Sequence, residues 1–92
     1  MIRVRFLRSF YDSLDELDPR ERKKARSSVA RLLDYFDGGP KPLGLGLRKS
    51  QGGFWEVRAG LDRRILFMLE GNLATFVSAA NHDEISRRSR SR

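Results

Sequence analysis

Residues 54–80 read FWEVRAGLDRRILFMLEGNLATFVSAA, and they carry most of the information about the fold. This stretch contains three runs rich in β-branched and aromatic residues, at Phe54 to Ala59, Arg63 to Glu70 and Leu73 to Ala80. Two short links, each with a glycine, separate the runs. Links of this kind join antiparallel neighbours. The sequence therefore predicts an antiparallel meander over these residues.

Side chains alternate between the two faces of a sheet along each strand. If Trp55 and Val57 face the core, Arg58 lies on the opposite, open face. On the next strand Arg63 and Arg64 are adjacent, so they point to opposite faces. The pattern thus places arginines on the face of the sheet that does not pack against the core.

A strong helix start precedes this half of the chain. Asp18 can cap free backbone N–H groups, Pro19 suits the first helical position, and Glu21 can complete a capping box. The glycines and proline of residues 38–40 end the helix, because glycine accepts a positive φ and proline forbids continuation. A helix is predicted between these signals.

Residues 2–17 predict a strand and then another helix. Apolar and basic side chains alternate from Ile2 to Phe6, which is the period of a strand. The spacing then becomes helical, and one apolar stripe is expected against the core: Leu7, Phe10, Tyr11, Leu14 and Leu17. An N-terminal strand, an αα-hairpin and a three- to four-stranded antiparallel meander make an α+β fold.

The glycine-rich segment 40–53 reads as a long loop or an irregular edge strand around Leu45. It carries three basic residues, Lys41, Arg48 and Lys49. Long loops in compact domains often bind ligands. This segment is therefore a candidate binding region.

The length of 92 residues, 39 % of them hydrophobic, is enough for one compact core. We expect a single domain over residues 1–86 and a basic, flexible tail over residues 87–92, where arginines stand among serines. The chain contains no cysteine and one histidine, so we expect neither a disulfide nor a metal site. A P-loop or Gly-x-Gly-x-x-Gly motif is also absent from the sequence, and no small-molecule cofactor is expected.

The charge balance points to a polyanion or an acidic protein as partner. Nineteen Lys plus Arg residues against twelve Asp plus Glu give a formal net charge of +7. The alternative is that the charge serves solubility, for which roughly 2 to 8 charges suffice. No run approaches the roughly 18 apolar residues of a membrane span. We therefore expect a cytoplasmic protein with no membrane partner.

The order of elements and four short motifs resemble the RelE/ParE superfamily of bacterial type II toxin–antitoxin systems, and most of all its RelE and YoeB ribonuclease toxins. The motifs are Pro40-Lys41-Pro42-Leu43, Gly53-Phe54-Trp55, Arg63-Arg64-Ile65-Leu66-Phe67 and Asn81-His82. The resemblance implies a RelE-like microbial ribonuclease-type fold. It also implies a ribosome-dependent mRNA endoribonuclease that inhibits translation, with mRNA on the ribosome and an acidic cognate antitoxin as partners.

The resemblance also implies roles for particular residues. RNA cleavage without a metal needs a base, a donor to the phosphorane and an acid for the leaving oxygen. Arg58, Arg64 and His82 are the candidate catalytic residues, and histidine is the side chain whose ordinary pKa lies near neutrality. The expected RNA-binding residues are Lys41, Arg48, Lys49, Arg63, Arg87 and Arg88.

Plainer interpretations stay open for these residues. Arg58 and Arg64 could pair with Glu56 and Asp62 across the hairpin, and His82 could be an ordinary surface or capping residue. The chain also departs from the RelE branch at Glu56, where that branch has a basic residue. Two other functions therefore stand beside the ribonuclease: a ParE-like DNA gyrase poison without catalysis, and a degenerate relative that only binds RNA or antitoxin.

Overall fold

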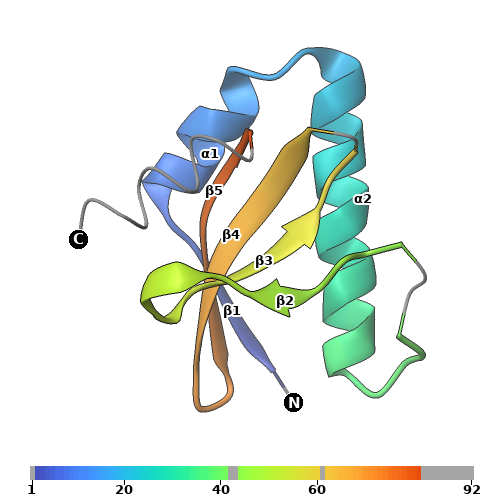
Figure 1. Ribbon diagram of the computed structural model, residues 1–92, viewed down its shortest axis with the longest axis vertical. Helices are drawn as coiled ribbons and strands as arrows, with labels where there is room; N and C mark the ends of the chain where they lie inside the picture. Colours follow the sequence, from blue (N-terminus) through green and yellow to red (C-terminus); the bar gives the residue numbers. More distant parts are fainter. Residues whose placement is uncertain (1, 42–43, 61, 82–92) are drawn as a thin grey trace.

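The computed structural model of the chain describes residues 2–41, 44–60 and 62–81. In these ranges it has a mixed sheet, two α-helices and one short 3-10 turn, η1 (Figure 1). The elements are β1 (Arg3–Phe6), α1 (Arg8–Asp15), α2 (Pro19–Phe36), β2 (Arg48–Lys49), η1 (Gln51–Gly53), β3 (Trp55–Arg58), β4 (Arg63–Glu70) and β5 (Leu73–Asn81). The predicted α+β class and order of elements are confirmed.

The sheet has five strands in the order β1-β5-β4-β3-β2. The strands β2, β3, β4 and β5 form the predicted antiparallel meander. β1 joins the edge of the sheet parallel to β5, so the complete sheet is mixed. The first and last strands are thereby neighbours in the sheet although they are far apart in sequence.

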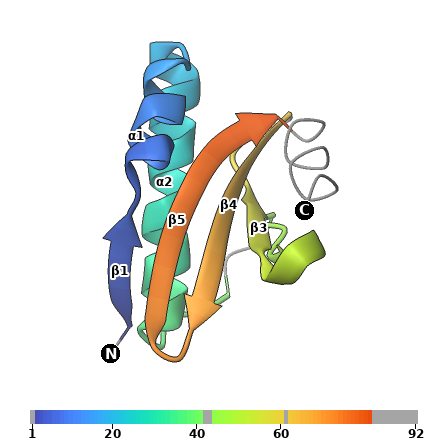
Figure 2. The ribbon, with the colours of Figure 1, turned by 90° about the vertical axis from the view of Figure 1, so that its left-hand side faces the viewer.

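Both helices lie on one side of the sheet, and η1 lies on the other (Figure 2). The start of α2 is the predicted capping box: Glu21 N–H donates to Asp18 Oδ1 at 2.8 Å, and Asp18 N–H donates to Glu21 Oε1 at 3.3 Å. At the other end Gly38 has a φ of +97°, and the Gly39 N–H donates to the Asp34 carbonyl at 2.9 Å. This is a Schellman ending, which supplies donors for the last free carbonyl groups.

The main core fills the space between the helices and the sheet. Its largest fully buried side chains include Phe67, Phe76, Leu32 and Ile65. Phe76 stacks on Phe67 with ring centroids 5.3 Å apart. A bulge at Val77 shifts the register of β5 against β4 by one residue, because Leu66 is paired with Ser78 and Phe67 with Phe76.

The apolar stripe expected on α1 is narrower than the sequence suggested. Phe10 and Leu14 are buried, whereas Tyr11 is 54 % exposed, so its expected place against the core was wrong. Successive helical residues are about 100° apart, which puts Tyr11 on the flank of the stripe that Phe10 and Leu14 define. In the loop after α2, by contrast, Leu45 is buried in the core, and its carbonyl accepts from Arg58 N–H at 2.7 Å.

None of the helices in the described ranges is both long enough and apolar enough to cross a membrane.

Candidate phosphate-binding site on the open face of the sheet

Two arginines occupy opposed positions on neighbouring strands. Arg58, at the end of β3, is paired with Arg64 near the start of β4. Their chain neighbours Val57 and Ile65 are fully buried in the core under the helices, so the two arginines face the other way. Arg58 is exposed, and the Arg64 side chain is 15 % exposed. The predicted alternation of faces on these strands is confirmed.

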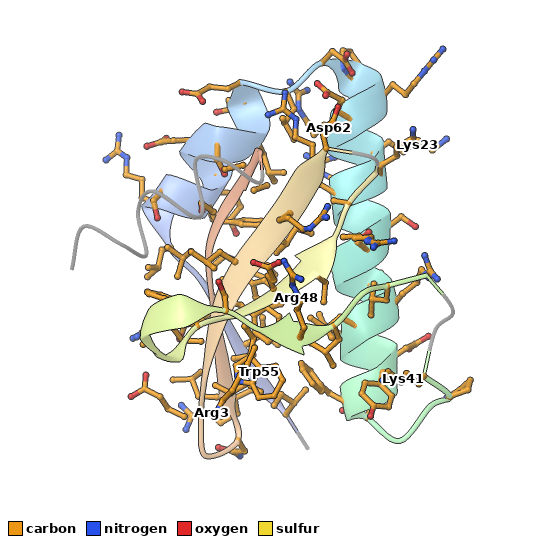
Figure 3. All side chains as sticks on the ribbon, viewed as in Figure 1. Arg3, Lys23, Lys41, Arg48, Trp55 and Asp62 are labelled. Atoms are coloured by element: carbon orange, nitrogen blue, oxygen red, sulfur yellow. The ribbon has the colours of Figure 1, made fainter. Side chains whose placement is uncertain are left out.

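A buried carboxylate lies beside these arginines. Glu56 precedes Arg58 by two residues and therefore shares its face, yet the Glu56 side chain is 3 % exposed. Its Oε1 accepts a hydrogen bond from Arg48 Nε at 2.8 Å and lies 3.8 Å from Arg64 Nε. Arg48 is the partner of Glu56 in the register of β2 and β3, and Figure 3 shows it in front of the sheet. We call Arg48, Arg58 and Arg64 the arginine cluster.

The arginine cluster has an excess of positive charge. Three guanidinium groups and one carboxylate, that of Glu56, give this patch a formal net charge of +2. Guanidinium groups bind phosphate oxygens through paired N–H donors and keep their charge at all physiological pH values. The patch can therefore bind a phosphate and stabilise negative charge that develops on it.

An apolar patch borders the arginine cluster on the same face. Leu66 is paired with Glu56, and Ala80 is paired with Arg64. The patch is formed by Phe54, Leu66 and Ala80, with Met68 and Val77 at its margin. Phe54, Leu66 and Ala80 are only 2 to 8 % exposed, so they form a second, small buried core beside the arginine cluster and support the strands that carry it.

The loop before β2 supports the Arg58 side chain. Gly46 has a φ of +65°, and a Cβ built on it would lie 3.1 to 3.2 Å from Cγ, Cδ and Nε of Arg58. The backbone of the loop is therefore in close contact with the stem of this arginine. A side chain at position 46 would have to displace it.

The structure does not bring three of the predicted RNA-binding residues into this cluster. Arg63 faces the helices, where its Nε donates to Glu21 Oε2 at 3.1 Å. Lys49 Nζ lies 5.8 Å from the centroid of the Trp55 ring, and Figure 3 places the exposed Lys41 near the C-terminal end of α2. The ion pair of Arg63 argues against the RNA contact expected of it, while both lysines remain exposed.

His82, Arg87 and Arg88 lie outside the described residues, as does the predicted tail over residues 87–92. The described chain ends at Asn81, one residue after Ala80, the partner of Arg64. In the described ranges no group of three or more His, Cys, Asp or Glu side chains could hold a metal ion.

The role of Glu56 is the part of the site that sequence reasoning missed. The alternative that Arg58 and Arg64 pair with Glu56 and Asp62 holds in one respect, since Arg64 lies near Glu56. Arg58 makes no ion pair with any described residue, and neither does Asp62. The alternation on β3 places Glu56 on the open face, but its contact with Arg48 depends on the register of β2.

Solved structures of toxins share this architecture. The RelB–RelE antitoxin–toxin complex from Methanococcus jannaschii matches with a TM-score of 0.69 and 17 % identity, over 91 % of this chain and 96 % of that one. The DinJ–YafQ toxin–antitoxin complex from Escherichia coli matches with a TM-score of 0.70 and 14 % identity, over 90 % and 94 %. YafQ from Escherichia coli strain BL21(DE3) matches with a TM-score of 0.67 and 13 % identity, over 92 % of this chain and 98 % of that one.

No protein-family model and no curated protein sequence matches the chain. The sequence identities are only 13 to 17 %, whereas the coverage is high and the TM-scores are near 0.7. The similarity to these structures is therefore one of three-dimensional arrangement. The helices, the mixed five-stranded sheet and their order agree with these neighbours. The chain therefore has the α+β fold of the RelE and YafQ toxins of toxin–antitoxin systems.

Proposed function

We propose that the protein is the toxin of a type II toxin–antitoxin system and inhibits translation in the cytoplasm as a ribosome-dependent mRNA endoribonuclease. The observation that supports this most is the opposed pair of Arg58 and Arg64 on the face of the sheet that the helices leave open. An anion bound between or above two cations held this close would relieve their repulsion. A phosphodiester is the anion that an endoribonuclease must bind.

The proposed reaction is an attack of the RNA 2′-oxygen on the adjacent phosphorus. The bond from phosphorus to the 5′-oxygen breaks, a base removes the 2′-hydroxyl proton, and an acid protonates the leaving oxygen. Arg58 and Arg64 hold the scissile phosphate and stabilise the phosphorane. His82 takes part in proton transfer. Arg48, Lys41, Lys49, Arg87 and Arg88 contact the RNA backbone, whereas Arg63 is left out because it pairs with Glu21.

The proposed second partner is an acidic antitoxin. The net charge of +7 favours an acidic segment electrostatically. Neighbours of the same fold have been solved as RelB–RelE and DinJ–YafQ complexes of antitoxin and toxin. A protein that cleaves its own host's messages would need such a neutraliser.

The test is induced expression of the wild-type chain without an antitoxin, followed by primer extension on translated messages. We expect growth arrest and site-specific cuts inside reading frames, and we expect no cuts in the same message after its start codon is removed. Growth arrest with DNA damage and uncut messages would replace the proposal with a ParE-like gyrase poison. Normal growth in cells that demonstrably express the protein would mean that it is not toxic, and would favour a relative that only binds RNA or antitoxin.

A further inference from the structure

Glu56 is an unusual residue for a face that binds polyanions. Its carboxylate reduces the positive charge of the arginine cluster and so opposes RNA binding. The residue is 2 % exposed, and a buried carboxylate is costly unless it is paired. A glutamate in this position needs a physical reason.

The contacts of Glu56 show what it can do for the cations. Its Oε1 faces the Nε atoms of both Arg48 and Arg64, at 2.8 and 3.8 Å. A guanidinium that is held through Nε keeps its two terminal nitrogens for another acceptor. For Arg48 those nitrogens have no hydrogen-bond partner among the described residues, and Arg64 uses one of them on the Arg63 carbonyl at 3.2 Å. Arg48, whose side chain is 59 % exposed, therefore has two accessible terminal donors, and the largely buried Arg64 has one terminal nitrogen without a partner among the described residues.

We propose that Glu56 is a positioning residue, which fixes the guanidinium groups of Arg48 and Arg64 so that their terminal N–H groups converge with Arg58 on one phosphate of RNA. The inference deepens the proposed function and rests on it for the identity of the substrate. It also makes Arg48 part of the phosphate site rather than a distant backbone contact.

The arrangement of exposed and buried groups favours this over an ordinary surface ion pair. The Arg48 side chain is 59 % exposed. An ion pair between two exposed side chains restricts their motion only weakly. Here the acceptor is buried on the rigid strand β3, directly opposite Arg48 in the register. The long side chain is thus tied at Nε to a fixed point, which reduces the entropy it loses when it binds an anion.

Charge makes a sharp test possible. Glu56→Gln preserves the shape of the side chain and raises the formal net charge from +7 to +8, and Glu70→Gln does the same at an exposed site at the end of β4. If Glu56 only adds negative charge, both variants should cleave as well as the wild type and bind RNA slightly more tightly. If Glu56 positions the arginines, Glu56→Gln alone should lower kcat/KM by roughly 10 to 100-fold in spite of its added positive charge.

A second measurement does not depend on cleavage. Inorganic phosphate is titrated into labelled protein while the Nε–H signals of the arginines are followed by NMR. We expect slow solvent exchange of the Arg48 Nε–H and faster exchange in Glu56→Gln, because a neutral amide oxygen is a weaker acceptor than a carboxylate. We also expect phosphate-induced shifts of Arg48, Arg58 and Arg64 that weaken at least several-fold in the variant. Glu70→Gln should match the wild type.

The outcomes separate the two proposals. Unchanged exchange and unchanged phosphate binding in a folded Glu56→Gln protein would overturn the positioning role, whatever the protein cleaves. The expected NMR pattern in a wild-type protein that never cuts RNA would retain the positioning role and reject the ribonuclease. If Glu56→Gln does not fold, Arg48→Ala removes the same link from the exposed side, and unaltered phosphate binding in that variant would overturn the proposal.

Discussion

Arg58 and Arg64 are directly opposite one another in the register of β3 and β4. Like charges in opposed positions of a sheet destabilise it. The ion pair with Glu56 reduces the repulsion for Arg64, whereas Arg58 forms no ion pair with any described residue. The arrangement is therefore unfavourable for the isolated fold and favourable for binding an anion. Such a conflict between stability and local charge is typical of functional sites.

Replacing Arg58 with alanine should separate the two effects. We expect Arg58→Ala to fold with unchanged stability or a gain of up to about 1 kcal/mol, because an unfavourable pair is removed. The same variant should no longer arrest growth. Urea denaturation and a growth assay on matched expression levels measure the two effects. A destabilisation of several kcal/mol would mean that Arg58 is a structural residue.

Trp55 should be important for stability, unlike Tyr11. Trp55 is half-buried against the core under the helices, so Trp55→Ala should cost about 2 to 3 kcal/mol, somewhat less than a fully buried ring. Tyr11→Ala, at an exposed ring, should cost about 1 kcal/mol or less. The free energies of unfolding of the two variants, measured by urea titration, test this difference. Equal costs would mean that the faces of β3 have been assigned wrongly.

Salt dependence should distinguish two adjacent arginines on opposite faces. Removing one arginine that binds a phosphate should reduce the slope of log affinity against log salt by roughly 0.7 for single-stranded RNA. We expect this reduction for Arg64→Ala and none for Arg63→Ala, since Arg63 is paired with Glu21 on the helix side. Binding of a short single-stranded RNA at several salt concentrations gives the slopes. A wild-type affinity independent of salt would favour a protein target.

His82 should affect the rate of cleavage more than binding. If it transfers a proton, His82→Gln should retain ribosome binding and slow cleavage by roughly 10² to 10⁴. The wild-type rate should titrate near neutral pH, and the variant should lose this dependence. Cleavage at the wild-type rate by His82→Gln would transfer the role to another group, such as Asp83, Glu84 or water.

Local signals in the sequence predicted most of the fold. Asp18, Pro19 and Glu21 specify the start of α2 within four residues, and alternation along β3 and β4 assigns their faces. These signals act between residues that are close in sequence, so they are readable without a structure. Tyr11 shows their limit, because spacing alone does not tell the centre of an apolar stripe from its flank.

Long-range features could not be predicted in the same way. The parallel pairing of β1 with β5 joins Arg3 to Leu73, and no local pattern encodes it. The contact between Arg48 and Glu56 depends on the register of a two-residue strand that follows a long loop. Register is set by turn geometry and by which face is buried, and neither is apparent in the glycine-rich segment.

Two adjacent arginines on opposite faces of β4 allow a matched test of the open face as the phosphate-binding site. Primer extension on translated messages is performed after equal expression of the wild type, Arg64→Ala and Arg63→Ala, with both variants shown to be folded. We predict that the wild type and Arg63→Ala produce the same cuts within reading frames and that Arg64→Ala produces none. Cuts of equal strength from a folded Arg64→Ala protein would contradict the assignment of this face.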